Sequence, residues 1–136
     1  LIAILPYEKD YILRFCADLR LSNKEKTILL DMVKMADFLD GDFKIKNLKV
    51  AAFKFGKSLV LDFILSNMAN CYETYKELAS FEVPKFPIDG QLLMKYNVKS
   101  GPNMGRVLKN LQQIWFENDF TIDDNIIAQE IEKSRF

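Results

Sequence analysis

Apolar residues recur every three or four positions along most of the chain, and few stretches alternate between apolar and polar residues as strands do. This spacing predicts helices over residues 7–19, 22–39, 44–55, 57–81, 91–96, 102–117 and 123–133. The expected fold class is therefore all-α, a compact array of about six to seven helices joined by short loops.

Capping and helix-breaking residues set the expected boundaries. Ser22 and Glu25 have the spacing of a capping box, in which each side chain bonds to the backbone of the other residue. Gly56 is expected to separate the third helix from the fourth. Prolines at both ends of residues 84–87 predict a short extended linker. We expect a helical body over 1–83 and a helical tail over 84–136, which together form one compact unit.

The tail contains a helix start that favours an anionic ligand. Gly101, Pro102 and Gly105 lie at the beginning of the helix over 102–117. The window 90–116 contains lysines and an arginine but no Asp or Glu. Free N–H groups and the helix dipole favour an anion at such a position, so a phosphate is the expected ligand. Gly105 is expected to permit close packing of one helix on another.

This turn is similar to the second half of a helix-hairpin-helix motif, which grips a nucleic-acid backbone without reading bases. The predicted phosphate contacts in the tail are Lys99, Ser100, Gly101, Asn103, Gly105, Arg106 and Lys109. The alternative is an ordinary turn between helices, in which the glycines serve packing only.

A second candidate is a lysine-rich helix face in the body. Lys46 and Lys49 are predicted RNA contacts, and Lys54 and Lys57 extend the same acid-free stretch. Phe53 lies among these lysines, as an exposed aromatic side chain that stacks on a base would. The alternative is a solvated helix face with no ligand.

Composition excludes several classes of function. The chain has no histidine, which removes the usual general base near neutral pH, and its formal net charge is zero. Cys16 and Cys71 are expected to be buried and reduced. No stretch is long and apolar enough for a membrane helix, so we expect no membrane contact. The sequence also contains no catalytic motif, metal site or cofactor site that we recognise.

Three segments together resemble one protein family. They read LIAILPYEKD at residues 1–10, LRLSNKEKTIL at 19–29 and FPIDGQLLMKYNVKSGPNMGRVLKNLQQIWFENDF at 86–120. The set is similar to the C-terminal half of bacterial class II CCA-adding tRNA nucleotidyltransferases and their poly(A) polymerase relatives. The family motif positions that carry over are Gly101, Pro102, Gly105 and Arg106.

The resemblance implies a cytoplasmic, all-helical body and tail that hold the elbow of tRNA. In the full enzyme a separate N-terminal head domain adds CCA from CTP and ATP with magnesium. None of the head's signature motifs occurs in this sequence, so the resemblance implies a C-terminal fragment without activity of its own. The missing basic C-terminal extension favours the CCA-adding enzymes over the poly(A) polymerases. The rival hypotheses are a DNA-binding helix-hairpin-helix module and a structural or protein-interaction domain.

Overall fold

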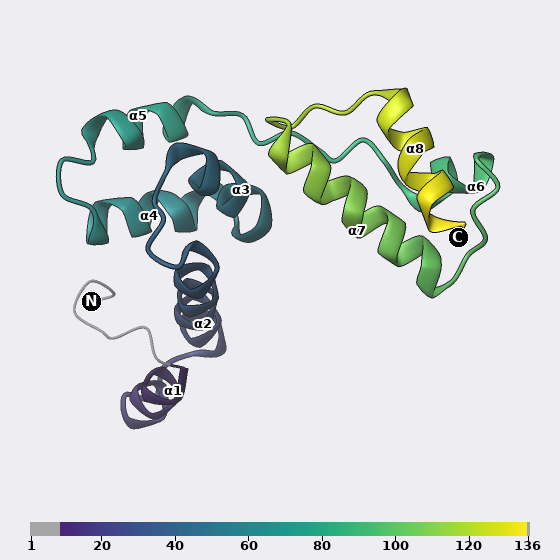
Figure 1. Cartoon of the computed structure of the whole chain (residues 1–136). Coiled ribbons are helices and arrows are strands. Elements are labelled where there is room, and N and C mark those ends of the chain that lie inside the picture. The colour runs from purple at the N-terminus through teal and green to yellow at the C-terminus, as the bar shows by residue number, and fades with distance from the viewer. Residues whose placement is uncertain (1–8, 136) are drawn as a thin grey trace. The chain divides into compact units, whose positions relative to one another are not determined.

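The computed structural model describes residues 9–135, and across this range the chain forms eight helices and no strands, which confirms the all-α prediction (Figure 1). The helices are α1 (Lys9–Asp18), α2 (Asn23–Leu39), α3 (Ile45–Phe55), α4 (Lys57–Asn67), α5 (Tyr72–Ser80), α6 (Gly90–Lys95), α7 (Pro102–Glu117) and α8 (Asp124–Ser134). No helix within 9–135 is long and apolar enough to cross a bilayer.

The contacts divide the chain into two compact units, with the division between Val83 and Pro84. Unit 1 contains α1 to α5, and unit 2 contains α6 to α8. Each has its own buried apolar cluster.

The core of unit 1 lies among α2, α3, α4 and α5. Its fully buried side chains come from all four helices, and they include Met35, Leu48, Phe63 and Leu78. The predicted capping box starts α2: the Ser22 hydroxyl accepts from the Glu25 backbone N–H, and the Glu25 carboxylate accepts from the Ser22 N–H at 2.8 Å. Gly56 ends α3 with φ 95°, as its predicted role as a breaker requires.

Lysines join the helices of unit 1. The Lys49 ammonium lies 3.3 Å from the Glu77 carboxylate and 5.2 Å from the ring centre of Phe81, which ties α3 to α5. The Lys57 ammonium donates to the backbone oxygens of Ala79 and Phe81 at 2.9 and 3.1 Å. A cation at these last carbonyls stabilises the C-terminal end of α5.

The single helix predicted over 57–81 is wrong, because the structure divides it into α4 and α5. Asn70 lies in the turn between them with φ 52°, a left-handed conformation that Asn tolerates better than most residues do. Within α4 Phe63 is buried and Leu65 is 60% exposed, and Tyr72 at the start of α5 is 70% exposed.

The first helix has one buried face. Its predicted start at residue 7 lies outside the described residues, and the described part of α1 begins at Lys9. Ile12 and Cys16 are buried on its inner face, whereas Tyr11 and Leu19 are exposed. Both cysteines are free, and Cys71 is half-buried where we expected full burial.

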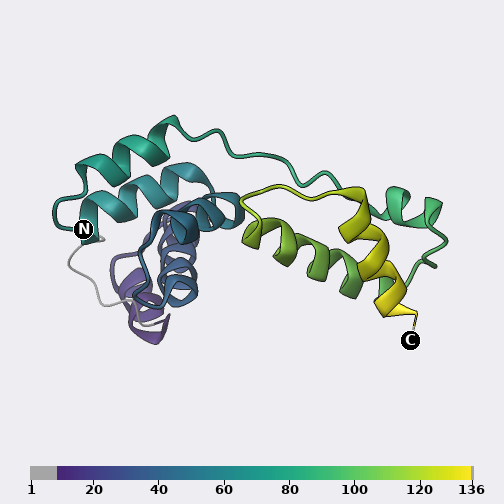
Figure 2. The same ribbon diagram turned by 45° about the horizontal axis from the view of Figure 1, so that its top comes forward.

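Unit 2 is built on the packing of α8 along α7 (Figures 1 and 2). Leu93 of α6, Leu111 of α7 and Ile127 of α8 are among the residues of its buried cluster. An aromatic group closes the far end, where the Trp115 ring centre lies 5.2 Å from that of Phe86 and 5.0 Å from that of Phe120. These contacts hold the linker and the turn after α7 against the same helix.

Replacement of Ser22 by Ala tests the cap of α2. We expect Ser22→Ala to lower the free energy of unfolding by about 1 kcal/mol, because a first-turn N–H loses its side-chain acceptor. Urea unfolding followed by circular dichroism measures the change. Ser58→Ala, at an exposed serine inside α4, is the control and should leave stability nearly unchanged. Equal effects of the two substitutions would contradict the cap.

The same cap predicts a pH dependence. Hydrogen bonds from the Ser22 side chain and from its backbone lower the pKa of Glu25 below its ordinary value of 4.5. Folding therefore favours the ionised carboxylate of Glu25. The resulting stabilisation is complete above pH 4.5 and is lost as the pH falls through the lower pKa of the folded state. Glu25→Gln should be less stable than the parent at neutral pH. The two proteins should be equally stable at a pH low enough to protonate Glu25 in both the folded and the unfolded parent. Urea unfolding of both proteins from neutral to acidic pH tests the prediction. A difference in unfolding free energy that does not change with pH would refute it.

Candidate nucleic-acid interface

The turn between α6 and α7 presents the predicted phosphate contacts to solvent. Asn97 enters the turn with φ 61°, and Val98 is buried, with its N–H bonded to the Leu93 oxygen at 3.1 Å. Lys99 and Ser100 follow and are exposed. Burial of Val98 thus fixes the path of the backbone, and the next two side chains point outward.

The first turn of α7 begins with an unusual backbone conformation. Gly101 has φ 144° and precedes Pro102 at the first helical position. Gly101 has no side chain that could accept from the first-turn N–H groups, and it leaves this positive helix end without a side-chain cap. Within the turn, the Arg106 guanidinium donates to the Asn103 side-chain oxygen at 3.0 Å.

The end of α8 meets the start of α7. Ser134 and Arg135 line one shallow pocket together with the turn residues from Asn97 to Asn103, and they line an adjoining pocket with Arg106. Further along the two helices, the Asn110 amide donates to the Glu130 carboxylate at 3.1 Å. The two helices are thus antiparallel, since residues early in α7 face residues late in α8.

Four cationic side chains gather around these adjoining pockets, and we call them the cationic cluster: Lys99, Arg106, Lys133 and Arg135. Arg135 is held in place by donating to the backbone oxygen of Tyr96 at 3.0 Å. One acid lies in the same region. Glu130 has a side chain only 13% exposed, and its carboxylate is 3.7 Å from the Lys133 ammonium.

Lys133 and Arg135 were not among the phosphate contacts predicted from the sequence. They lie far from Arg106 along the chain, in and after a helix that reads as acidic. A cation near the end of a helix also has an ordinary structural explanation, because it stabilises the last carbonyls. Only the antiparallel pairing of α7 and α8 brings these two side chains to the start of α7.

The structure brings together five of the predicted contacts at the two pockets: Lys99, Ser100, Gly101, Asn103 and Arg106. Gly105 and Lys109 are exposed on α7 but line neither pocket. They are one helical turn apart and therefore lie on a common face of α7.

Lys46 and Lys49 belong to α3 of unit 1 and are not part of this cluster. Lys46 is exposed, whereas Lys49 is engaged with Glu77 and has a side chain only 20% exposed. The Lys54 ammonium lies 4.6 Å from the ring centre of Phe38, and Phe53 is half-buried, not exposed as expected. Most of the lysine-rich face of α3 thus makes contacts within the protein.

The packing role expected for Gly105 is wrong. A Cβ atom at Gly105 would meet no atom of the described residues within 4 Å, and the same holds at Gly101. The glycine that permits close packing is Gly90, where a Cβ would lie 3.2 Å from the Met104 sulfur. Gly101 is required by its backbone conformation, but Gly105 is an exposed helical glycine without a packing reason among the described residues.

The described residues contain no group of three or more His, Cys, Asp and Glu side chains placed to hold a metal ion. No known protein family, curated protein or solved structure matches the chain.

Substitution of the two glycines separates their roles. Gly105→Ala should raise the free energy of unfolding of unit 2 by about 0.5–1 kcal/mol, because Ala favours the helix and finds open space. Gly101→Ala should lower it by about 1 kcal/mol or more, because φ 144° is strained for Ala. Trp115, the one tryptophan of the chain, reports the unfolding of unit 2 by fluorescence. Destabilisation by Gly105→Ala would restore the packing role.

Proposed function

We propose that this chain is the RNA-holding part of a tRNA nucleotidyltransferase, and that unit 2 binds the RNA phosphate backbone. The observation that carries the proposal is the cationic cluster around the uncapped start of α7. Arginine and lysine side chains that surround free N–H groups form a surface suited to phosphates. Such contacts position a nucleic acid but do not read its sequence.

Two arginines of the cluster are already oriented. Asn103 holds the Arg106 guanidinium, and the Tyr96 backbone oxygen holds that of Arg135. Each contact leaves other N–H groups of the guanidinium for a phosphate, because the group has five donors. Ordering these long side chains before binding reduces the entropy lost when RNA arrives. Lys99 is exposed and has no ion-pair partner within residues 9–135, so it adds charge without this constraint.

The identity of the RNA rests on the family resemblance of the three segments. It supports a parent protein that adds CCA to tRNA in the cytoplasm, with CTP, ATP and magnesium handled by a separate head domain. The proposed role of this chain is to hold the tRNA elbow by shape, as suits an A-form helix whose deep major groove side chains cannot read. A poly(A) polymerase of the same family is the alternative parent, and the cluster would hold RNA in the same way.

The alternative of a structural domain is disfavoured by the glycines. If Gly101 and Gly105 served packing within residues 9–135, atoms of these residues would lie close to the missing side chains, yet none of them lies within 4 Å. An exposed glycine beside cations instead lets another molecule approach the helix backbone closely.

Salt dependence and charge reversal test the RNA proposal. If about four cations contact phosphates, the logarithm of the tRNA binding constant should fall with log salt at a slope of about −3 to −4. Arg106→Glu should weaken tRNA binding and reduce this slope, with helicity unchanged. Lys24→Glu makes the same charge change at an exposed site of α2 and is the control. Fluorescence anisotropy of labelled tRNA measures the affinity of each variant and its dependence on salt.

Each alternative predicts a different result. A salt-independent affinity, or equal effects of Arg106→Glu and Lys24→Glu, would contradict a backbone contact at the cluster. Equal affinity for tRNA and for duplex DNA of the same length would favour the helix-hairpin-helix DNA module. No affinity for either nucleic acid would leave the structural domain as the better account.

A further inference from the structure

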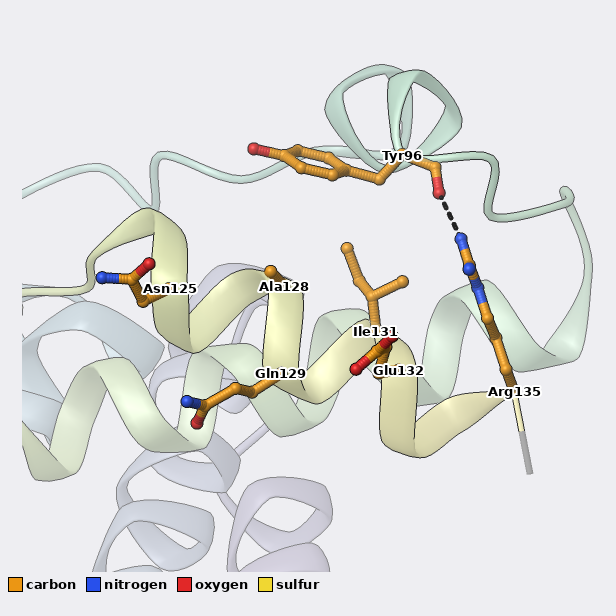
Figure 3. A pocket seen from close by; sticks show the side chains of 7 residues that line it. All are labelled: Tyr96, Asn125, Ala128, Gln129, Ile131, Glu132 and Arg135. Atoms are coloured by element: carbon orange, nitrogen blue, oxygen red, sulfur yellow. Dashed lines mark hydrogen bonds between the residues drawn. The ribbon is translucent and has the colours of Figure 1, made fainter.

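A second pocket of unit 2 adjoins the cationic cluster and has different chemistry. Figure 3 shows the Tyr96 ring lying along α8, with Ala128 and Ile131 pointing toward it from the helix. Asn125 and Gln129 lie at the end away from Arg135, and Arg135 closes the other end through its bond to the Tyr96 oxygen. We call this pocket the tyrosine slot.

The walls of the tyrosine slot suit a flat heteroaromatic ring. Tyr96 is half-buried, exposed Ala128 and buried Ile131 lie on the α8 side of its ring, and the carboxylate of Glu132 also lines the slot. The amides of Asn125 and Gln129 each carry both a donor and an acceptor, so they match the mixed edge of a nucleobase.

Arg135 connects the slot to the cationic cluster, because it lines the slot and both pockets of the cluster. A nucleotide has its base and its phosphate on opposite sides of a sugar. A base in the slot therefore places the adjacent phosphates toward Arg135 and the start of α7. Arg135 is thus in a position to serve both parts of one nucleotide.

We propose that the tyrosine slot binds one unpaired nucleobase of the RNA whose phosphates lie on the cationic cluster. This inference rests on the proposed function and adds a preference that backbone contacts cannot supply. A base within a duplex is stacked on both faces and cannot enter a slot between Tyr96 and α8. A base in a loop or bulge is free to do so, and aromatic side chains commonly stack on such bases.

Two RNA hairpins with the same number of nucleotides, each closed by a non-nucleotide linker so that neither has loop bases, test this inference with the full chain. One is fully paired in its stem, and the other carries a single bulged 2-aminopurine. The bulged hairpin should bind about fivefold more tightly or better, which is the gain expected from one base stacked on an aromatic ring. The 2-aminopurine fluorescence should fall on binding, because stacking on tyrosine quenches it.

Substitutions of Tyr96 and Arg106 test whether the preference for the bulged hairpin arises in the tyrosine slot. Tyr96→Phe should keep both the preference and the quenching, whereas Tyr96→Leu, which retains an apolar side chain but no ring, should lose both. Arg106→Ala, in the cluster but outside the slot, should weaken binding of the two hairpins by the same factor. Circular dichroism checks that each variant keeps its helices.

The outcomes separate this inference from the proposed function. Equal, salt-sensitive binding of the two hairpins would overturn the tyrosine slot but support the backbone contact. A preference for the bulge that persists in Tyr96→Leu would also overturn it, since the base would then bind elsewhere. Absence of binding to either hairpin would overturn both proposals.

Discussion

The antiparallel packing of α8 on α7 is the constraint on which the candidate site depends. Ile127 and Ile131 of α8 share one buried cluster with Val107 and Leu111 of α7. Burial of these side chains contributes most of the stabilisation available to so small a unit, because apolar area removed from water is the dominant favourable term in folding. The same packing places the end of α8 beside the start of α7. The cationic cluster is thus assembled by the core, although none of its members is buried.

The lysines of the two units illustrate how the same side chain takes different roles. In unit 1, Lys49 pairs with Glu77, and Lys57 bonds the last carbonyls of α5, so these charges are used to join helices. In unit 2, Lys99 projects from a turn that is anchored by the burial of Val98. Lysines that look alike in the sequence therefore join helices in one unit and stay exposed in the other.

Much of the helical pattern could be predicted because its signals are local. Ser22 with Glu25 and Gly101 with Pro102 predicted helix starts, and the structure confirms both. The break at Asn70 was missed because an isolated Asn in an apolar-periodic stretch resembles any polar helical residue. Arg135 was missed for another reason: its place beside Arg106 follows from the pairing of two helices, and no local pattern encodes that pairing.

The most direct test of the account is a titration of the ¹⁵N-labelled chain with tRNA, followed by amide chemical shifts. The account predicts that the largest changes fall at Lys99, Arg106 and the residues around Arg135, and that added salt reverses them together. These residues are distant in sequence, so coincident changes require the surface that α7 and α8 form jointly. Changes confined to unit 1, with the start of α7 and the end of α8 unaffected, would contradict the central claim.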